Sequence, residues 1–226
     1  MEKTENKFVL EAKGISRTYK GEVPVPALKK TDIAFNEGEF AAIIGRSGSG
    51  KSTLLRILAA LDIPDTGEIC VEQKKISDLN DSELARFRRR RIGFVYQDYN
   101  LFPEYTAYEN IVFPIHLDGR TEDKAAIEKL MSDLGILHCR DKFPHEMSGG
   151  EQQRTSIARA LATEPAVILA DEPTGNLDAE NAAKVVELLR FCSEKYSQTI
   201  VMVTHDQSMA SYADRIIRIL DGVVTE

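Results

Sequence analysis

One short stretch, "IIGRSGSGKSTLL", restricts the possible fold more than any other part of the sequence. It sets glycines and serines, then a lysine and two hydroxyls, between an apolar run and a leucine-rich segment. The apolar run fits a buried strand, and "KSTLLRILAAL" fits a helix. Glycines between them leave the backbone free to turn its N–H groups inward. The fold must therefore bury a strand and a helix in its core while it keeps the polar loop between them.

The loop itself predicts a phosphate site. Gly45, Gly50, Lys51 and Ser52 satisfy the pattern G-x-x-x-x-G-K-[ST]. Inward N–H groups and the positive end of the helix attract a polyphosphate, Lys51 would bridge its β- and γ-phosphates, and the Ser52 hydroxyl would ligate Mg²⁺. The alternative is a glycine-rich turn that happens to contain a lysine, and the strand and helix on either side argue against it. The motif predicts nucleotide binding without specifying the reaction.

The pattern of apolar residues predicts an α/β fold. Three nearly continuous apolar runs fit strands buried on both faces of a parallel sheet: "FAAIIG", "AVILAD" and "TIVMVTH". Two sets of residues with helical spacing lie between them, namely Ile127, Leu130, Met131 and Leu134, and Val185, Leu188, Leu189 and Cys192. Up to about Phe35 the pattern predicts antiparallel strands with a turn at "KGEVPVP". We expect residues 98–163 to form a helical lobe inserted into one domain spanning residues 1–226.

Composition narrows the class of protein. The 226 residues suffice for one large core, and a net charge of −7 argues against a general nucleic-acid binder. No apolar run approaches the length of a membrane span, and the polar N-terminus "MEKTENKFVL" lacks a signal core, so we expect a cytoplasmic protein. The cysteines Cys70, Cys139 and Cys192 predict reduced, mostly buried thiols. His138 beside Cys139 lacks a second ligand pair at metal spacing, which favours ordinary packing over a metal site.

Two further motifs have chemical significance. In "ILADEPT", Asp171 at the end of an apolar run could hold Mg²⁺, and Glu172 could polarise water, although acidic pairs are common after strands. In "MSGGEQQR", Ser148 and Glu151 fit a capping box. A cap does not require Gly149 and Gly150, which cost about 1 kcal/mol each in a helix. These glycines suggest that a ligand approaches the backbone closely, at a second anion-binding helix start.

Four stretches, taken in their order along the chain, resemble the motifs of the nucleotide-binding subunit of an ABC transporter. They are "GRSGSGKST", "SGGEQQR", "ILADEPTGNLD" and "VTHD". The resemblance covers about residues 8–224. It implies an α/β P-loop fold with a RecA-like, mainly parallel sheet, an N-terminal antiparallel β subdomain and an inserted helical subdomain. It also implies ATP and Mg²⁺ as cofactors and a head-to-tail homodimer, in which the "SGGE" helix of one copy caps the γ-phosphate held by the other.

The resemblance assigns roles to individual residues. Tyr19 would stack on adenine, although it also fits a core aromatic of a strand. Gln97 would reach Mg²⁺ and the attacking water, and Asp171 would serve the metal with Ser52. Glu172 would be the general base, His205 would hold the water in line, and Lys51 completes the catalytic set. The implied ATP contacts are Tyr19, Gly45, Arg46, Ser47, Gly48, Ser49, Gly50, Lys51, Ser52, Thr53, Ser148, Gly149, Gly150, Glu151 and Asp178, the last at the dimer seam. Met147 and Glu151 depart from the commoner Leu and Gln.

The stretch after Gln97, "YQDYNLFPEYTAYENI", resembles the branch of lipoprotein-releasing, macrolide-export and antimicrobial-peptide-resistance ATPases. This implies a separate integral membrane permease, which holds the chain at the inner face of the membrane. Leu101, Phe102, Tyr105 and Tyr108 either line a groove for a permease helix or only pack the helical lobe.

Other functions remain to be weighed. The basic run from Arg88 to Arg91 follows an acidic helical segment, so helix-end cations explain it without nucleic acid. Related ATPases of DNA repair carry a long insertion between Gln97 and Ser148, and those of translation carry two cassettes. This chain has neither. A non-hydrolysing module is disfavoured because Glu172 and His205 are present.

Overall fold

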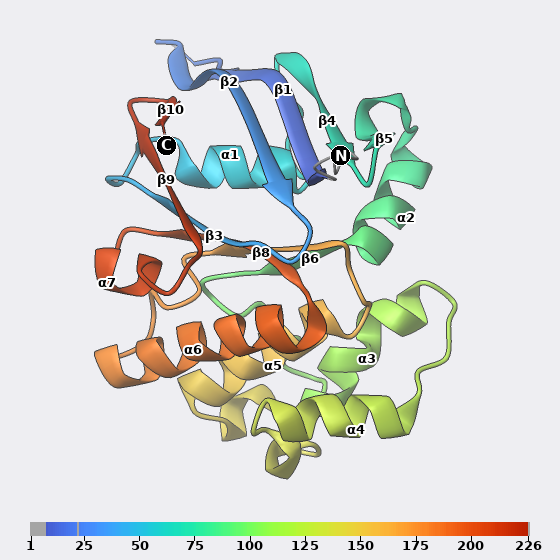
Figure 1. Cartoon of the computed structure of the whole chain (residues 1–226). Coiled ribbons are helices and arrows are strands. Elements are labelled where there is room, and N and C mark those ends of the chain that lie inside the picture. Colours follow the sequence, from blue (N-terminus) through green and yellow to red (C-terminus); the bar gives the residue numbers. More distant parts are fainter. Residues whose placement is uncertain (1–7, 22, 226) are drawn as a thin grey trace, which may run out of the picture.

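A computed structural model describes residues 8–21 and 23–225. Two sheets lie one above the other, with one helix between them and several helices beneath the larger sheet (Figure 1). The predicted α/β class is confirmed. The first seven residues, which carry most of the N-terminus judged to lack a signal core, and Glu22 of the predicted turn lie outside the described residues.

The larger sheet is mainly parallel. Its strand order is β10-β9-β3-β8-β7-β6. The bounds are β3 Phe40–Ile44, β6 Ile92–Val95, β7 Val167–Asp171, β8 Thr199–Thr204, β9 Arg215–Leu220 and β10 Val223–Thr225. Neighbouring pairs from β9 to β6 are parallel, and β10 pairs antiparallel with β9. The three predicted apolar runs are therefore adjacent strands, whereas β9 and β10 were not anticipated from the sequence.

The apolar runs are continuous because each strand fills two cores. Along β8, Ile200 and Met202 join the cluster below the sheet, whereas Val201 and Val203 join the cluster above it. Successive side chains of a strand point to opposite faces, so a sheet covered on both sides needs apolar residues at every position. Every residue of β8 is buried.

The smaller sheet confirms the predicted antiparallel strands near the N-terminus. Its order is β2-β1-β4-β5, with β1 Phe8–Tyr19, β2 Val25–Asn36, β4 Thr66–Val71 and β5 Lys74–Lys75. All three pairings are antiparallel. The sequence analysis did not anticipate β4 and β5.

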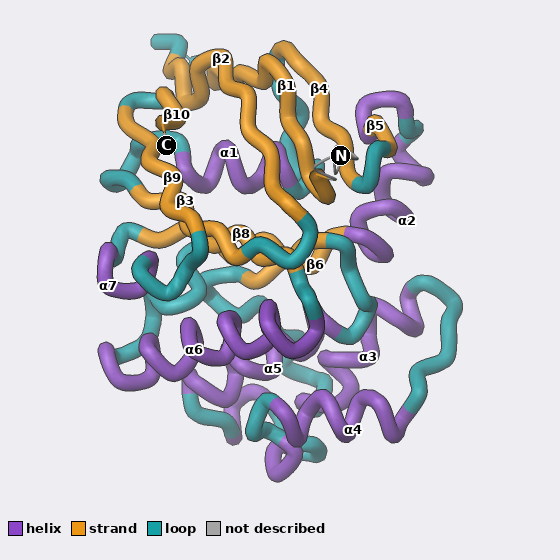
Figure 2. Tube along the Cα trace, in the orientation of Figure 1, coloured by secondary structure: helices purple, strands orange, loops and turns teal. Residues whose placement is uncertain are grey.

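Helix α1, Lys51–Leu58, is the layer between the two sheets (Figure 2). Leu54, Leu55, Ile57 and Leu58 are fully buried in one cluster with Phe35 of the upper sheet and with strands of the lower sheet. The helix that begins at the glycine-rich loop is therefore held from both sides.

The other helices cover the remaining surfaces. Below the large sheet lie α3 Ala107–Leu117, α4 Lys124–Asp133, α5 Gly149–Leu161 and α6 Ala179–Tyr196. The 3₁₀ turns η2 Leu137–Cys139 and η3 Pro144–Glu146 lie between α4 and α5 in the chain, and Cys139 joins the core cluster below the sheet. The remaining short elements are α2 Asp81–Arg91, α7 Gln207–Ala210 and the 3₁₀ turn η1 Ile76–Asp78. The predicted helical spacings fall in α4 and α6. Across residues 98–163, the described secondary structure is entirely helical. Among the described residues, no helix has the length and apolarity of a membrane span.

The basic run lies in the last turn of α2, where its cations have partners within the chain. Arg88 donates to the Ala60 carbonyl at 3.0 Å, and Arg89 and Arg90 both pair with Asp118. Arg91 forms an ion pair with Glu72. Cations already paired with carboxylates are less available for phosphates.

We predict that Leu55→Ala lowers the free energy of unfolding by about 2–5 kcal/mol, because the fully buried leucine leaves a cavity between the two sheets. Leu117→Ala is the matched control, since Leu117 is 58% exposed and its loss should change stability by less than about 0.5 kcal/mol. Urea unfolding followed by circular dichroism measures both. Equal shifts for the two variants would contradict the buried position of α1.

Candidate functional site

Three side chains that the sequence predicts to be catalytic meet where β3, β7 and β8 end. Lys51 begins α1 just after β3, Glu172 follows β7 and His205 follows β8. The Glu172 carboxylate lies 3.9 Å from Lys51 Nζ and 2.6 Å from His205 Nδ1. Carboxyl ends of parallel strands share one edge of the sheet, which is where open α/β sheets bind ligands.

The loop from Gly45 to Gly50 is shaped by close backbone approach. A Cβ at Gly45 would overlap the Ile219 carbonyl oxygen, and one at Gly50 would overlap the Ala27 carbonyl oxygen. Gly50 also has φ 104°, in the region that favours glycine. The tip of the loop from 46 to 48 is exposed, so its backbone is open to a ligand from solvent.

Lys51 is buried, yet its ammonium group is well satisfied. Nζ donates to the carbonyl of Gly45 at 2.9 Å and to that of Arg46 at 3.0 Å, and only 6% of the residue is exposed. A buried cation needs such partners. The side chain thus lies along the inside of the loop, where an anion bound to the loop would meet it.

Ser52 and Asp171 form an oxygen-rich pair. Ser52 Oγ donates to Asp171 Oδ1 at 3.0 Å. Burial raises the pKa of Asp171, which the Ser52 hydrogen bond partly opposes. A hydroxyl and a partly buried carboxylate at a phosphate loop are the donor types that Mg²⁺ uses, so these residues fit the metal.

Glu172 has an unusual backbone. Its φ of 47° lies in the left-handed region, and its N–H donates to the Val203 carbonyl at 3.0 Å. Such a conformation costs of order 1–3 kcal/mol and persists only where the surroundings fix it. The turn directs the carboxylate toward His205 and Lys51 instead of continuing the strand.

Gln97 lies beside a loop that the sequence analysis gave no role. Its Nε2 donates to Asn176 Oδ1 at 3.4 Å, and a Cβ on Gly175 would touch its side chain. Asn176 returns a bond to the Gln97 carbonyl at 3.2 Å and one to Asp98 at 2.8 Å. The contacts recorded for Gln97 therefore go to residues 175 and 176, not to Ser52 or Asp171.

The predicted capping box at α5 is confirmed. Ser148 Oγ accepts from the Glu151 N–H at 3.3 Å, and Glu151 Oε2 accepts from the Ser148 N–H at 2.7 Å. The Ser148 hydroxyl also donates to Glu151 Oε2 at 2.7 Å, and this bond together with that from the Ser148 N–H lowers the pKa of Glu151. The hydrogen bonds of Ser148 stay within residues 148–152.

The two glycines after Ser148 differ in their surroundings. A Cβ at Gly149 would lie 2.9 Å from the Tyr99 hydroxyl, so the fold itself restricts this position. A Cβ at Gly150 would meet only side-chain atoms of Arg154 and Asn181, at 3.4 Å or more. Packing against Tyr99 therefore explains the glycine at position 149 without a ligand, whereas no backbone among the described residues crowds position 150.

Arg159 is a further linking residue that the sequence analysis missed. From α5 its guanidinium donates to the carbonyls of Tyr99 at 2.8 Å and Asn100 at 2.5 Å. Both residues have positive φ, 60° and 48°. Arg159 thus fixes the segment after Gln97 to the helix that Ser148 begins. The only sequence signal for this role of Arg159 is that it is a single cation among the small and apolar residues of "SIARALA".

Tyr19 and Asp178 lie at the ends of elements. Tyr19 is 38% exposed at the end of β1, its hydroxyl donates to Asp62 at 2.9 Å, and the Arg17 guanidinium carbon lies 5.1 Å from its ring centroid. Tyr19 is therefore not a core aromatic. Asp178 caps α6 by accepting from the Asn181 N–H at 2.9 Å, and this hydrogen bonding lowers its pKa.

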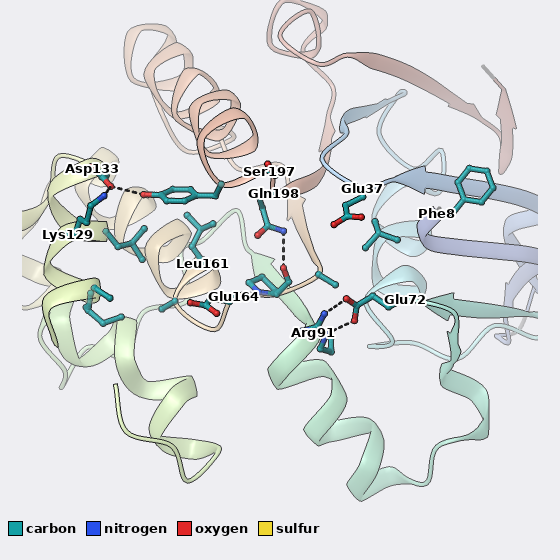
Figure 3. A pocket seen from close by; sticks show the side chains of 18 of the residues that line it. Phe8, Glu37, Glu72, Arg91, Lys129, Asp133, Leu161, Glu164, Ser197 and Gln198 are labelled. Atoms are coloured by element: carbon teal, nitrogen blue, oxygen red, sulfur yellow. Dashed lines mark hydrogen bonds and ion pairs between the residues drawn. The ribbon is translucent and has the colours of Figure 1, made fainter. Parts of the chain in front are cut away.

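A cavity of about 760 Å³ lies away from these residues. Figure 3 shows it between the Arg91–Glu72 ion pair and Asp133, with Gln198 donating to the Pro165 carbonyl at 3.1 Å. Glu37, Arg91, Ala166 and Gln198 precede β3, β6, β7 and β8. The cavity is thus at the amino ends of the strands, at the edge opposite the phosphate loop, so its size does not identify the nucleotide site.

Comparisons with known proteins agree with a nucleotide site at the phosphate loop. A family model described as ABC transporter matches residues 28–175. The lipoprotein-releasing system ATP-binding protein LolD of Cytophaga hutchinsonii is 43% identical over 218 residues, covering 96% of this chain and 98% of LolD. The bacitracin export ATP-binding protein BceA of Halalkalibacterium halodurans is 44% identical over 220 residues, covering 96% and 87%.

A solved structure is similar over the whole chain. It is the dimeric post-hydrolysis state of the ATP-binding cassette MJ0796 of Methanocaldococcus jannaschii, bound to ADP and Pi. Its TM-score is 0.85 at 41% identity, and the match covers 96% of this chain and 97% of that one. The chain therefore belongs to the ABC transporter family, as an ATP-binding protein and ATPase.

Proposed function

We propose that this chain binds ATP with Mg²⁺ between two copies of itself and uses hydrolysis to drive a separate membrane permease. The observation that carries the proposal is the meeting of Lys51, Glu172 and His205 at the carboxyl ends of three parallel strands. This arrangement places a cation for the phosphates beside a carboxylate base and its orienting imidazole.

Substrate binding follows from the loop. The backbone of residues 45–53 wraps the triphosphate, the N-terminus of α1 faces it, and Lys51 moves from the loop carbonyls to the β- and γ-phosphates. Tyr19, exposed at the end of β1, stacks on the adenine. Ser52, Asp171 and Gln97 would hold Mg²⁺, which supplies positive charge for the transferring phosphoryl group.

Glu172 is the general base of the hydrolysis step. Its carboxylate takes a proton from water, the water oxygen attacks the γ-phosphorus in line, and the bond to the β–γ bridging oxygen breaks, giving ADP and phosphate. His205, 2.6 Å from Glu172, orients this carboxylate and contacts the γ-phosphate. Lys51 stabilises the developing charge.

The second copy completes the site. The N–H groups at the start of α5 are an anion site, yet in one chain the hydrogen bonds of Ser148 are all local. A head-to-tail dimer brings residues 148–151 of each copy to the γ-phosphate held by the other, with Asp178 at the seam. The dimeric state described for MJ0796 supports this arrangement.

Coupling to the permease runs through the segment after Gln97. Phe102 and Tyr105 are 41% and 38% exposed, and the Phe102 ring packs 4.6 Å from that of Phe113. Tyr108 is buried, with its hydroxyl 3.3 Å from Glu122, so it packs the helical lobe instead. A permease helix docks on Phe102, Tyr105 and the half-buried Leu101, and Gln97 and Arg159 link this surface to the site.

The permease holds the chain at the cytoplasmic face of the membrane. Export, lipoprotein release or antimicrobial-peptide resistance is the function favoured by the similarity to LolD and BceA. We regard residues 1–226 as one domain, with the helical lobe at about residues 98–163. A role in DNA repair or translation is the alternative, and recovery of the chain without any membrane partner would favour it.

We predict that Glu172→Gln lowers ATP turnover by about 10²–10⁴-fold, because the base is lost while nucleotide contacts remain. With saturating ATP and Mg²⁺ the variant should accumulate as a dimer in analytical ultracentrifugation. Glu180→Gln, at an exposed position of α6, is the matched control and should behave as wild type. A Glu172→Gln chain that stays monomeric under these conditions would contradict the proposed dimer.

Lys51→Ala should lower turnover by at least about 10²-fold, since the transferring phosphate loses its main protein cation. A phosphate-release assay measures the turnover, and isothermal titration with ATP measures nucleotide binding. Lys184→Ala, which removes an exposed lysine of α6, serves as the control. Turnover near the wild-type rate would remove Lys51 from the mechanism.

A Phe102→Ser, Tyr105→Ser double variant should lose most of its association with membranes of its own cells, because the docking surface becomes polar. Fractionation followed by immunoblotting measures the membrane-bound share. Phe191→Ser, on the exposed face of α6, controls for loss of an aromatic residue as such. If the double variant sediments with membranes as wild type does, the proposed docking surface is wrong.

A further inference from the structure

Three side chains with different donor atoms meet at the start of α5. His138 Nε2 lies 2.7 Å from Glu151 Oε1, and Cys139 Sγ lies 3.1 Å from the same oxygen. The three donor atoms all lie within 4.8 Å of one another. The sequence shows no second ligand pair at metal spacing for His138 and Cys139, but the helix that follows brings one further ligand, Glu151, to them.

The donor set indicates which cation would bind. A thiolate, an imidazole nitrogen and a carboxylate oxygen suit a borderline-soft ion such as Zn²⁺, with bonds of about 2.0–2.3 Å, whereas Mg²⁺ prefers oxygen donors. Tetrahedral bonds of that length require donor atoms roughly 3–4 Å apart. The cluster needs only small side-chain movements to reach this spacing, and the fourth position is left to solvent.

The surroundings already orient the ligands. Glu151 Oε2 accepts from both the N–H and the hydroxyl of Ser148, each at 2.7 Å, so Oε1 is the oxygen that points to His138 and Cys139. Outer hydrogen bonds of this kind fix ligands in metal sites. The His138 side chain is 59% exposed, which gives an ion a path to the buried thiol of Cys139.

We propose that His138, Cys139 and Glu151 form a binding site for one Zn²⁺ per chain. The metal replaces the thiol proton of Cys139, which is released to solvent, and the hydrogen bonds within the cluster give way to three metal bonds. The site is distinct from the Mg²⁺ site at Ser52 and Asp171. It ties η2 to the first turn of α5, beside Ser148.

Co²⁺ is the probe, added to the tag-free, nucleotide-free chain in excess Mg²⁺. Wild type should give one equivalent of tetrahedral visible absorption and a thiolate-to-cobalt charge-transfer band in the near ultraviolet. Zn²⁺ should displace the Co²⁺ and raise the melting temperature of the chain by mass action. Both signals are independent of ATP turnover, so they can fail while the proposed function stands.

Matched variants assign the ligands. Cys139→Ala should abolish the charge-transfer band, whereas Cys70→Ala and Cys192→Ala should keep it. His138→Gln should weaken binding by at least about 10-fold. Glu151→Gln preserves the length of the capping side chain, because glutamine also serves in a capping box, but removes the anionic ligand and should weaken binding similarly. Far-ultraviolet circular dichroism confirms that each variant is folded.

The proposal is overturned by any of three results. These are no charge-transfer band in wild type, a band that survives Cys139→Ala, or a band that disappears in the Cys192→Ala control. If Cys139→Ala does not fold, His138→Gln and Glu151→Gln decide, and binding as tight as in wild type for both would exclude the site. In that case the cluster is only a hydrogen-bonded contact between η2 and α5.

Discussion

The parallel register of β3, β8 and β7 is the constraint on which the site depends. Ile44 pairs with Thr204, and Asp171 pairs with Val203, so the three strands end at one level of the sheet. The next residues are the first glycine of the phosphate loop, His205 and Glu172. Because these strands fill a core on each face, a one-residue slip in register would move each side chain to the opposite core and disrupt the packing of both. Core packing thus fixes the relative positions of the proposed catalytic groups, which are far apart in the sequence.

The charged side chains that gather at this edge of the sheet are paired or hydrogen-bonded to one another and to the loop. Lys51 is buried but bonded to loop carbonyls, and Glu172 lies between Lys51 and His205. Burial raises the pKa of Asp171 at this edge, whereas hydrogen bonds at the starts of α5 and α6 lower the pKa values of Glu151 and Asp178. A site for a triphosphate needs preorganised cations and N–H dipoles more than covalent chemistry. The left-handed backbone of Glu172 is held by the hydrogen bond from its N–H to the Val203 carbonyl at 3.0 Å.

The sequence predicted those parts of the fold that depend on apolar runs and on local motifs. Continuous apolar runs revealed β3, β7 and β8, and the glycine-lysine motif located the phosphate loop. The sequence did not reveal β4, β5, β9 or β10, because these strands are short or only partly buried and their apolar patterns are weak. The roles of Asn176 and Arg159 depend on contacts across 79 and about 60 positions of chain. For the same reason, nothing near His138 and Cys139 indicated that Glu151 would join them.

One chain supplies only half of the proposed ATP site, since Ser148 makes only local hydrogen bonds within its own chain. The most direct test is a crystal structure of the chain with Mg²⁺ and a non-hydrolysable ATP analogue. Our account predicts that Ser148 of one copy lies within about 3 Å of a γ-phosphate oxygen held by residues 45–53 of the other. A structure with the triphosphate bound, in which every assembly leaves Ser148 remote from any γ-phosphate, would contradict it.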